Sequence, residues 1–195
     1  MTILAIDPGL TCTGVVLLYP NGGFDALTLC PPKELDWRDR ASWIVWRLSG
    51  VFSTAMPQVL AIEEGYVQPH GRGARPALPE ALAAQIGVEQ RGPSRQKQAQ
   101  SRAALRTAEL RGQIAGLAAR TGCRVVGVQP SQALRALTGD GSPLSRGARK
   151  ATMGAWARIR YPGHEWTEDT ADALGVGLAA ERVLLDEKLR EGGSR

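Results

Sequence analysis

Cysteine, lysine and long apolar runs are all scarce in this sequence of 195 residues. The three cysteines, Cys12, Cys30 and Cys123, are odd in number and isolated from one another, which argues against a disulfide framework and a CxxC zinc site. We expect them to be small buried apolar residues. No apolar run approaches the roughly 18 residues of a membrane-spanning helix, and no secretory signal is visible. These absences predict a cytoplasmic protein without a membrane partner.

Arginine carries almost all of the positive charge. Lysine and arginine number 24 against 19 acidic residues, a formal net charge of +5, and the only lysines are Lys33, Lys97, Lys150 and Lys188. Guanidinium groups pair well with phosphates, so this balance suits a nucleic-acid partner, although biased codon usage would also produce it. The length and a hydrophobic content of 43% predict a single domain over residues 1–195.

The apolar patterning predicts strands first and then strands that alternate with helices. The expected strands are 2–6, 13–18, 24–29, 59–62 and 124–128. The expected helices are 36–52, 102–120, 131–137, one through 153–159 after a loop over 138–149, and 167–189, with Asp36 and Thr167 as N-caps. This order indicates an α/β fold with a mixed five-stranded sheet, in which helical crossovers add parallel strands to three antiparallel ones.

Two acidic residues end predicted buried strands. Asp7 closes the first strand, and Glu63 closes the strand 59–62. Ligands of open α/β sheets bind at the carboxyl ends of strands, so these acids are candidates for a shared site. The alternative is that each acid only begins a solvated turn.

The last predicted helix adds two acids to its apolar face. At about 3.6 residues per turn, Asp169 and Asp172 share one stripe with apolar residues of the following turns. Glu168 and Asp169 are also explained as first-turn acids that complement the helix dipole. Asp172 is not, because an unpaired carboxylate on an apolar stripe is costly and no nearby arginine in the sequence is an obvious partner.

Four acids without a histidine or cysteine cluster form a hard oxygen donor set, which suits Mg²⁺ or Mn²⁺ and argues against zinc. Two-ion sites of this kind hydrolyse phosphodiesters: one ion activates water and the other stabilises the leaving 3′ oxygen. Asp7, on the central strand, is best placed to bridge both ions. The basic net charge then predicts a polyanionic substrate.

These residues belong to motifs that resemble the RuvC family of Holliday junction resolvases, which are members of the ribonuclease H-like superfamily. The resemblance rests on Ile6-Asp7-Pro8-Gly9 with Thr13-Gly14, Ala61-Ile62-Glu63, Arg111-Gly112-Gln113 and Asp169-Thr170-Ala171-Asp172-Ala173-Leu174. It covers nearly the whole chain. It implies a ribonuclease H-like fold and a crossover junction endodeoxyribonuclease, which makes paired symmetric cuts in four-way DNA junctions during recombination and repair.

The resemblance also implies roles for single residues. Asp7, Glu63, Asp169 and Asp172 would be catalytic and bind two ions, Mg²⁺ with Mn²⁺ able to substitute, and Glu63 rather than Glu64 would face the site. The implied nucleic-acid contacts are an aromatic residue that stacks on a base at the junction centre and basic residues near phosphates: Tyr66, Arg135, Arg146, Arg149 and Lys150. The implied partners are four-way junction DNA and a second copy in a homodimer, with residues 105–119 near the interface. A branch-migration motor complex is left open as a further partner.

One stretch departs from the family pattern. Residues at about 69–101 are rich in Gly, Pro, Gln and Arg, and we interpret them as a basic insertion with one short helix near 79–88. The insertion is longer and more basic than the family pattern. One hypothesis is that it clamps the arms of the junction.

Three other functions compete with this interpretation. The first is a ribonuclease H-like nuclease that acts on another branched DNA or RNA substrate, which the sequence separates poorly from a resolvase. The second is a non-catalytic nucleic-acid-binding module, which the presence of all four acids disfavours. The third is a fragment of an actin-like ATPase, which is disfavoured because those folds need two such halves.

Overall fold

A mixed sheet of five strands forms the centre of the computed structural model, which describes residues 1–64, 95–142 and 144–192. The strands are β1 (Ile3–Asp7), β2 (Thr13–Leu18), β3 (Phe24–Leu29), β4 (Val59–Glu63) and β5 (Arg124–Val128), in the order β3-β2-β1-β4-β5. The pairs β1–β2 and β2–β3 are antiparallel, whereas β4 runs parallel to both β1 and β5. The predicted α/β architecture, a mixed five-stranded sheet of three antiparallel strands plus parallel ones, is confirmed.

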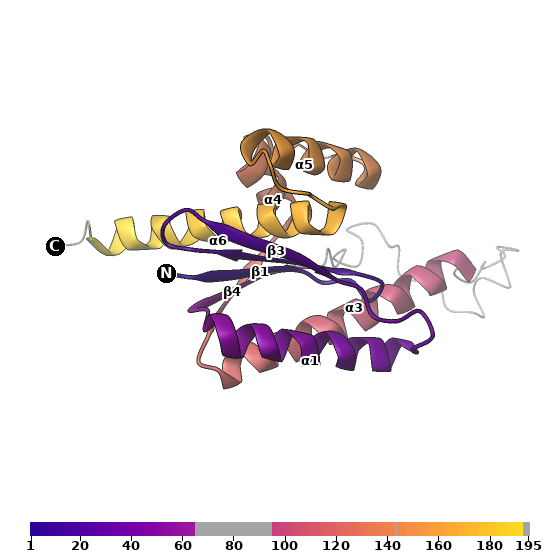
Figure 1. Cartoon of the computed structure of the whole chain (residues 1–195). Helices are drawn as coiled ribbons and strands as arrows, with labels where there is room; N and C mark the ends of the chain where they lie inside the picture. Colours follow the sequence, from indigo (N-terminus) through magenta and orange to yellow (C-terminus); the bar gives the residue numbers. More distant parts are fainter. Residues whose placement is uncertain (65–94, 143, 193–195) are drawn as a thin grey trace, which may run out of the picture.

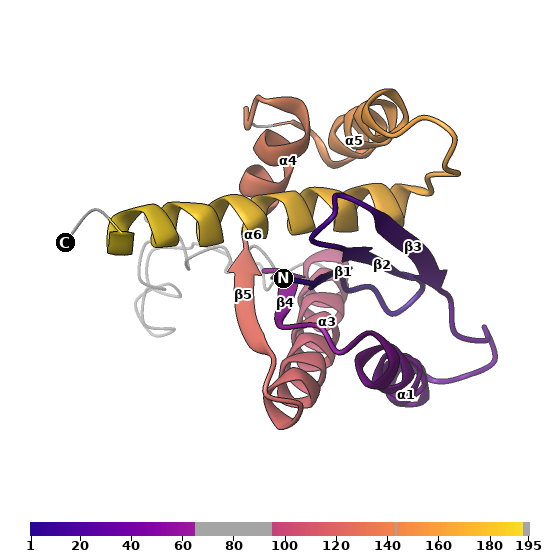
Figure 2. The ribbon, with the colours of Figure 1, turned by 60° about the vertical axis from the view of Figure 1, so that its left-hand side comes forward.

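Helices cover both faces of the sheet. Those within the described ranges are α1 (Trp37–Ala55), α3 (Arg95–Arg120), α4 (Pro130–Thr138), α5 (Arg146–Arg160) and α6 (Glu168–Gly192). Helices α1 and α3 lie on one face, whereas α6 crosses the other face with α4 and α5 on its outer side (Figures 1 and 2). Alternate residues of β1 serve the two layers: Leu4 and Ile6 pack with the α1 side, and Ile3 and Ala5 pack with the α6 side. Burial on both faces explains the continuous apolar run of this strand.

Two helix starts agree with the predicted caps. The Asp36 carboxylate accepts a hydrogen bond from the backbone N–H of Asp39 at 3.0 Å, at the start of α1. At the start of α6, Thr167 Oγ1 accepts from the backbone N–H of Thr170 at 3.1 Å, and Thr170 Oγ1 accepts from the N–H of Thr167 at 3.0 Å. This reciprocal pair fixes the direction in which α6 leaves the sheet.

Two other helix starts were predicted wrongly. Helix α3 begins at Arg95 rather than at 102, because the polar stretch 95–101 carries no apolar period that would reveal a helix. Helix α5 begins at Arg146, inside the expected loop 138–149, because Ser145 caps it by accepting a hydrogen bond from the N–H of Ala148 at 3.3 Å. The expected short helix at 79–88 lies outside the described residues, as does most of the basic insertion.

The largest correction concerns the cysteines. Cys12 and Cys30 form a disulfide, with Cα atoms 4.2 Å apart, whereas Cys123 is free and buried as expected. The register of the antiparallel pair β2–β3 explains the bond, because Thr13 lies opposite Leu29 and the two cysteines are the next residues outward. The number and spacing of cysteines carry no information about that register.

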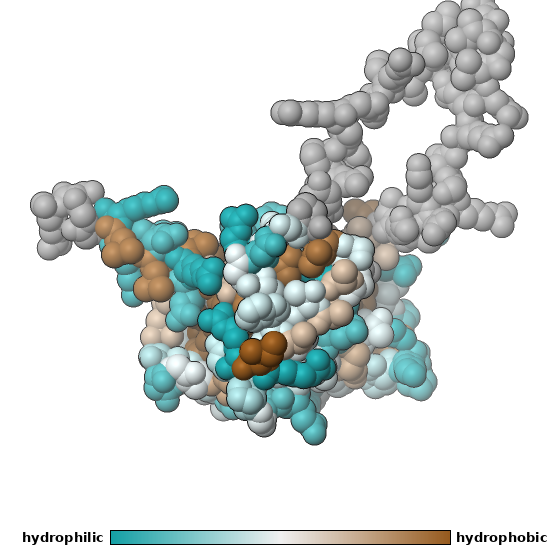
Figure 3. All heavy atoms as spheres, turned by 90° about the horizontal axis from the view of Figure 1, so that it is seen from above, coloured by the Kyte–Doolittle hydropathy of each residue, from teal (hydrophilic) through white to brown (hydrophobic). Residues whose placement is uncertain are grey.

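The outer surface over α4 and α5 is mostly hydrophilic, with small apolar areas (Figure 3). The exposed apolar residues of α5 and of the loop before it include Leu144, Trp156 and Ile159. Of the helices in the described ranges, none is long and apolar enough to cross a membrane.

Replacement of both Cys12 and Cys30 with serine should lower the free energy of unfolding. The disulfide joins residues separated by 18 positions, and closing a loop of this size restricts the unfolded chain by about 3 kcal/mol. Urea unfolding of the oxidised wild type, the reduced wild type and the double variant measures the effect. The reduced wild type should unfold with the variant; coincidence of the oxidised and reduced curves would contradict the assignment.

Candidate active site

Two of the predicted acids lie together because two strands end at the same edge of the sheet. Strands β1 and β4 run parallel with Ile6 opposite Ile62, so the next residues, Asp7 and Glu63, lie side by side. Helix α6 begins at this edge of the sheet and contributes Asp169 and, one turn further on, Asp172. Three elements that are distant in sequence therefore bring the four acids to one end of the molecule.

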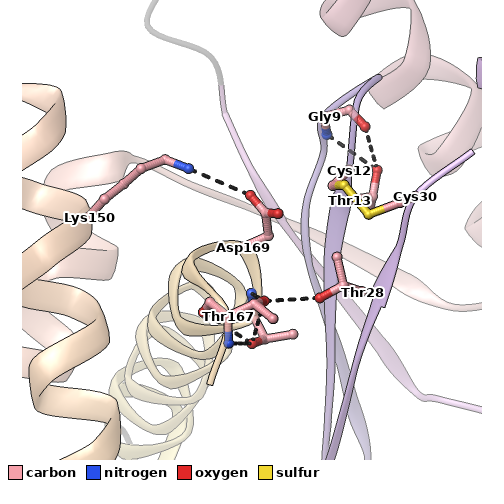
Figure 4. Close-up of a disulfide and its surroundings, with 9 residues drawn as sticks. Gly9, Cys12, Thr13, Thr28, Cys30, Lys150, Thr167 and Asp169 are labelled. Carbon is pink, nitrogen blue, oxygen red and sulfur yellow. Dashed lines mark hydrogen bonds and ion pairs between the residues drawn. A yellow bond between two sulfur atoms is a disulfide. The ribbon is translucent and has the colours of Figure 1, made fainter. Parts of the chain in front are cut away.

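Two contacts hold the first turn of α6 against the sheet. Asp7 pairs with Gly14 of β2, and a Cβ atom at Gly14 would lie only 1.9 Å from the carbonyl oxygen of Asp169. The second contact joins β3 to the residue before α6: the hydroxyl groups of Thr28 and Thr167 share a hydrogen bond of 3.0 Å (Figure 4). The missing side chain of Gly14 therefore permits the approach that places the acids of α6 beside Asp7.

The turn that follows Asp7 is fixed from within. The buried Thr13 hydroxyl donates a hydrogen bond to the carbonyl oxygen of Gly9 at 2.8 Å and accepts one from the Gly9 N–H at 3.3 Å (Figure 4). The Cys12–Cys30 disulfide ties the same turn to the end of β3. The position of Asp7 is thus constrained by the turn on one side and by β4 on the other.

The acids form one electrostatic cluster. Asp172 is only 2% exposed, and neither of its carboxylate oxygens has a hydrogen-bond partner within the part of the chain that the structure describes. Burial, followed by the negative charges of Glu63, Asp172 and Asp169, raises the pKa of Asp7 to about 7, although Arg149 opposes this shift. Burial also raises the pKa of Asp172 against the effect of nearby basic groups. The raised pKa values indicate that the described residues compensate the negative charge of Asp7 and Asp172 only in part.

Arg149, in the first turn of α5, contacts two of the acids. Its Nη1 atom lies 3.8 Å from Glu63 Oε2, and its Nη2 atom lies 3.9 Å from Asp172 Oδ2. The linear sequence did not indicate an arginine partner for Asp172, because the α4–α5 segment has to fold back over α6 before the two meet. Arg149 is therefore a partner of Asp172 that the sequence did not make obvious.

Lys150 contacts the acids at the start of α6. Its Nζ atom lies 3.6 Å from Asp169 Oδ1 (Figure 4) and donates a hydrogen bond of 3.2 Å to Glu168 Oε2. Burial alone would lower the pKa of Lys150, but the hydrogen bond to Glu168 and the negative charges of the nearby acids raise it above its ordinary value. Glu168, which the sequence explained only by the helix dipole, therefore also holds Lys150 in place.

The donor set fits a hard divalent cation. Among the described residues, no three His, Cys, Asp or Glu side chains already lie close enough together to hold a metal ion. The carboxylates nevertheless supply only oxygen donors, the Asp172 oxygens lack a hydrogen-bond partner in that part of the chain, and burial together with mutual repulsion raises the pKa of Asp7. A cation bound among them would partner the Asp172 oxygens and offset the repulsion between the carboxylates. Oxygen donors favour Mg²⁺ or Mn²⁺ over zinc.

The remaining predicted residues lie elsewhere or outside the described part. Glu64 is exposed and accepts a hydrogen bond from Gln129, next to β5. Arg135 is on α4. Its Nε atom would lie 2.9 Å from a Cβ atom added at Gly141, so its side chain lies against the loop that follows α4 rather than in contact with the acids. Tyr66 lies outside the described residues, and the side chain of Arg146, which begins α5, is also outside them.

Gly14→Ala should destabilise the protein by about 1–3 kcal/mol or more, because the new methyl group overlaps the backbone of α6. Gly50→Ala is the matched control, since a Cβ there meets nothing within 4 Å and alanine favours the helix. Denaturant unfolding should show a loss of stability for Gly14→Ala and no loss for Gly50→Ala. Equal stability of the two variants would refute the close approach of α6.

Asp7→Asn should stabilise the protein in EDTA at pH 8 by a few kcal/mol. The folded pKa of Asp7 is about 7, against an ordinary value of 3.8, so the folded state binds the proton more tightly. The corresponding stability is present below about pH 4 and is lost as the pH rises through 7. The gain from Asp7→Asn should therefore shrink toward pH 4, where thermal unfolding compares it with the exposed control Asp186→Asn. If Asp7→Asn is no more stable than the wild type at pH 8, burial and repulsion do not destabilise the charged form of Asp7.

The arrangement of the chain is similar to that of solved RuvC structures. A Thermus thermophilus RuvC structure matches with a TM-score of 0.61 and 19% sequence identity, over 95% of this chain and 97% of that one. T. thermophilus RuvC in complex with Holliday junction substrate matches with a TM-score of 0.62 and 20% identity, over 92% of each chain. No family model and no curated protein sequence matches. The fold of this chain, over nearly its whole length, is that of RuvC.

Proposed function

We propose that this chain is a metal-dependent endonuclease that resolves four-way DNA junctions by paired, symmetric phosphodiester hydrolysis. The observation that carries the proposal is the cluster of Asp7, Glu63, Asp169 and Asp172 at one end of a RuvC-like sheet, with basic side chains of α5 directly beside it. The solved structure of T. thermophilus RuvC with Holliday junction substrate supports the choice of DNA substrate.

The proposed roles follow from where each side chain lies. The four acids would hold the divalent ions, and Asp7, on the strand between β2 and β4, is the acid that could be shared by both. Two such ions, when bound, supply activation of a water and stabilisation of the leaving 3′ oxygen. Arg149 and Lys150, near the start of α5, are close enough to the acids to orient the phosphate that is cut.

The substrate and the assembly follow from the symmetry of the reaction. Two symmetric cuts in a four-way junction need two active sites related by a two-fold axis, so we propose a homodimer. The exposed Leu105 on α3 is compatible with an interface near residues 105–119. The basic net charge suits the DNA arms. Several further features stay predictions. They are base stacking by Tyr66, phosphate contacts by Arg135 and Arg146, clamping by the insertion, a branch-migration motor partner and a cytoplasmic location.

Asp172→Asn should reduce junction cleavage by about a thousandfold, since it removes a charged ligand from the reaction site while leaving the phosphate contacts in place. The assay uses an end-labelled immobile four-way junction in Mg²⁺, beside a linear duplex and an RNA–DNA hybrid of the same sequence. The wild type should make paired symmetric nicks in the junction only. Asp186→Asn removes the same charge from an exposed site on α6 and should cleave like the wild type.

Each other result points to a different protein. Cleavage of the hybrid or the duplex in preference to the junction would keep the metal site but refute the resolvase. Junction binding without cleavage of any substrate would favour a non-catalytic module. Full activity of Asp172→Asn would show that the proposed acid cluster is not the reaction site.

A further inference from the structure

Arg149 holds an unusual place for an arginine next to a set of candidate metal ligands. Its guanidinium group contacts Glu63 and Asp172 together, at 3.8 and 3.9 Å. These distances are longer than the roughly 2.7–3.2 Å of N–H···O hydrogen bonds. At these distances the group compensates charge without saturating Asp172, whose two oxygens still lack a hydrogen-bond partner in the described part of the chain.

Arg149 and Lys150 bring fewer positive charges to the site than the four carboxylates bring negative ones. One guanidinium carries one positive charge, while Lys150 is engaged by Asp169 and Glu168. A divalent ion carries twice that charge and binds carboxylate oxygens at about 2.0–2.1 Å, in the case of Mg²⁺. A metal ion on Glu63 and Asp172 would thus compete with Arg149 for the same oxygens and would repel the guanidinium.

Arg149 is fixed at its backbone and partly exposed at its side chain. Its backbone N–H donates a hydrogen bond of 2.9 Å to the carbonyl oxygen of Ser145, within the capped first turn of α5. Its side chain is 21% exposed, so the path from the acids to solvent is short. A guanidinium released from carboxylates presents the flat fork of donors that matches a phosphate.

We propose that Arg149 is a placeholder cation: it bridges Glu63 and Asp172 while the site holds no metal, and it yields these carboxylates to a divalent ion and turns to a phosphate of the substrate. The inference rests on the proposed metal site and deepens it, because it couples metal loading to phosphate contact through one side chain. A purely structural ion pair would have a different consequence. Its loss would weaken the fold and the metal site together.

Titration of the DNA-free protein with MgCl₂ by calorimetry tests the exchange. Arg149→Gln should bind Mg²⁺ about tenfold more tightly than the wild type, since the competing cation is gone. Arg158→Gln removes the same charge from an exposed position on the same helix and should change the affinity by less than about twofold. Arg149→Lys, whose single ammonium group cannot bridge both acids equally well, should fall between the wild type and Arg149→Gln and serves if that variant does not fold.

Unchanged or weaker Mg²⁺ binding by both Arg149 variants would overturn the proposal, as would the absence of Mg²⁺ binding by the wild type. Because this titration contains no DNA, a failure of junction cleavage leaves its result intact. If the protein cleaves junctions but its Arg149 variants bind Mg²⁺ like the wild type, the placeholder role of Arg149 is refuted and the proposed function stands.

Junction binding tests the second half of the exchange. With a fluorescent four-way junction, Arg149→Gln should bind as tightly as the wild type in EDTA, where the wild-type guanidinium is held by the acids. In Ca²⁺, chosen because its looser coordination is a poor match for a Mg²⁺ reaction site, the same variant should bind several-fold more weakly than the wild type. An equal loss in both conditions would show that Arg149 contacts DNA whether or not metal is bound, and would overturn the coupling.

Discussion

The close packing of the first turn of α6 on β2 is the contact on which the acidic site depends. It is possible because Gly14 has no side chain where the backbone of Asp169 passes, and it is supported by the hydrogen bond between Thr28 and Thr167. Without it, Asp169 and Asp172 would stand away from the strand ends that carry Asp7 and Glu63. The Thr13-Gly14 pair thus has a structural reason: the threonine holds the turn after Asp7, and the glycine admits the helix.

The site concentrates negative charge that the rest of the fold has to tolerate. Burial and mutual repulsion raise the pKa of Asp7, and the oxygens of Asp172 are buried without a hydrogen-bond partner in the described ranges. The apolar layers on both faces of the sheet supply the stability that offsets this cost. A basic first turn of α5 compensates part of the charge, which makes the same turn a natural link between the acids and a phosphate.

Local signals in the sequence were sufficient for most of the fold. The apolar runs and the turns between them predicted all five strands to within a residue, and the side-chain chemistry of Asp36 and Thr167 predicted two helix starts. The stripe on α6 also singled out Asp172 as an acid on a buried face, where the structure places it. The start of α3 was missed because a polar helix carries no apolar period.

Contacts between distant segments could not be predicted in this way. The disulfide depends on the register of β2 and β3, and the pairing of Arg149 with Asp172 depends on how α5 folds back over α6. Neither is encoded in spacing along the chain. The grouping of the four acids was foreseen from strand ends and helix periodicity, but the basic residues that contact them were expected only as DNA ligands.

Crystals of the protein soaked in Mn²⁺ would test the central claim, that these four acids form a divalent metal site. Anomalous scattering from manganese locates the ions without reference to activity. Our account predicts two peaks at the carboxyl ends of β1 and β4, ligated by Asp7, Glu63, Asp169 and Asp172, with Asp7 in contact with both. Manganese bound at another surface, or no peak beside Asp7, would contradict it.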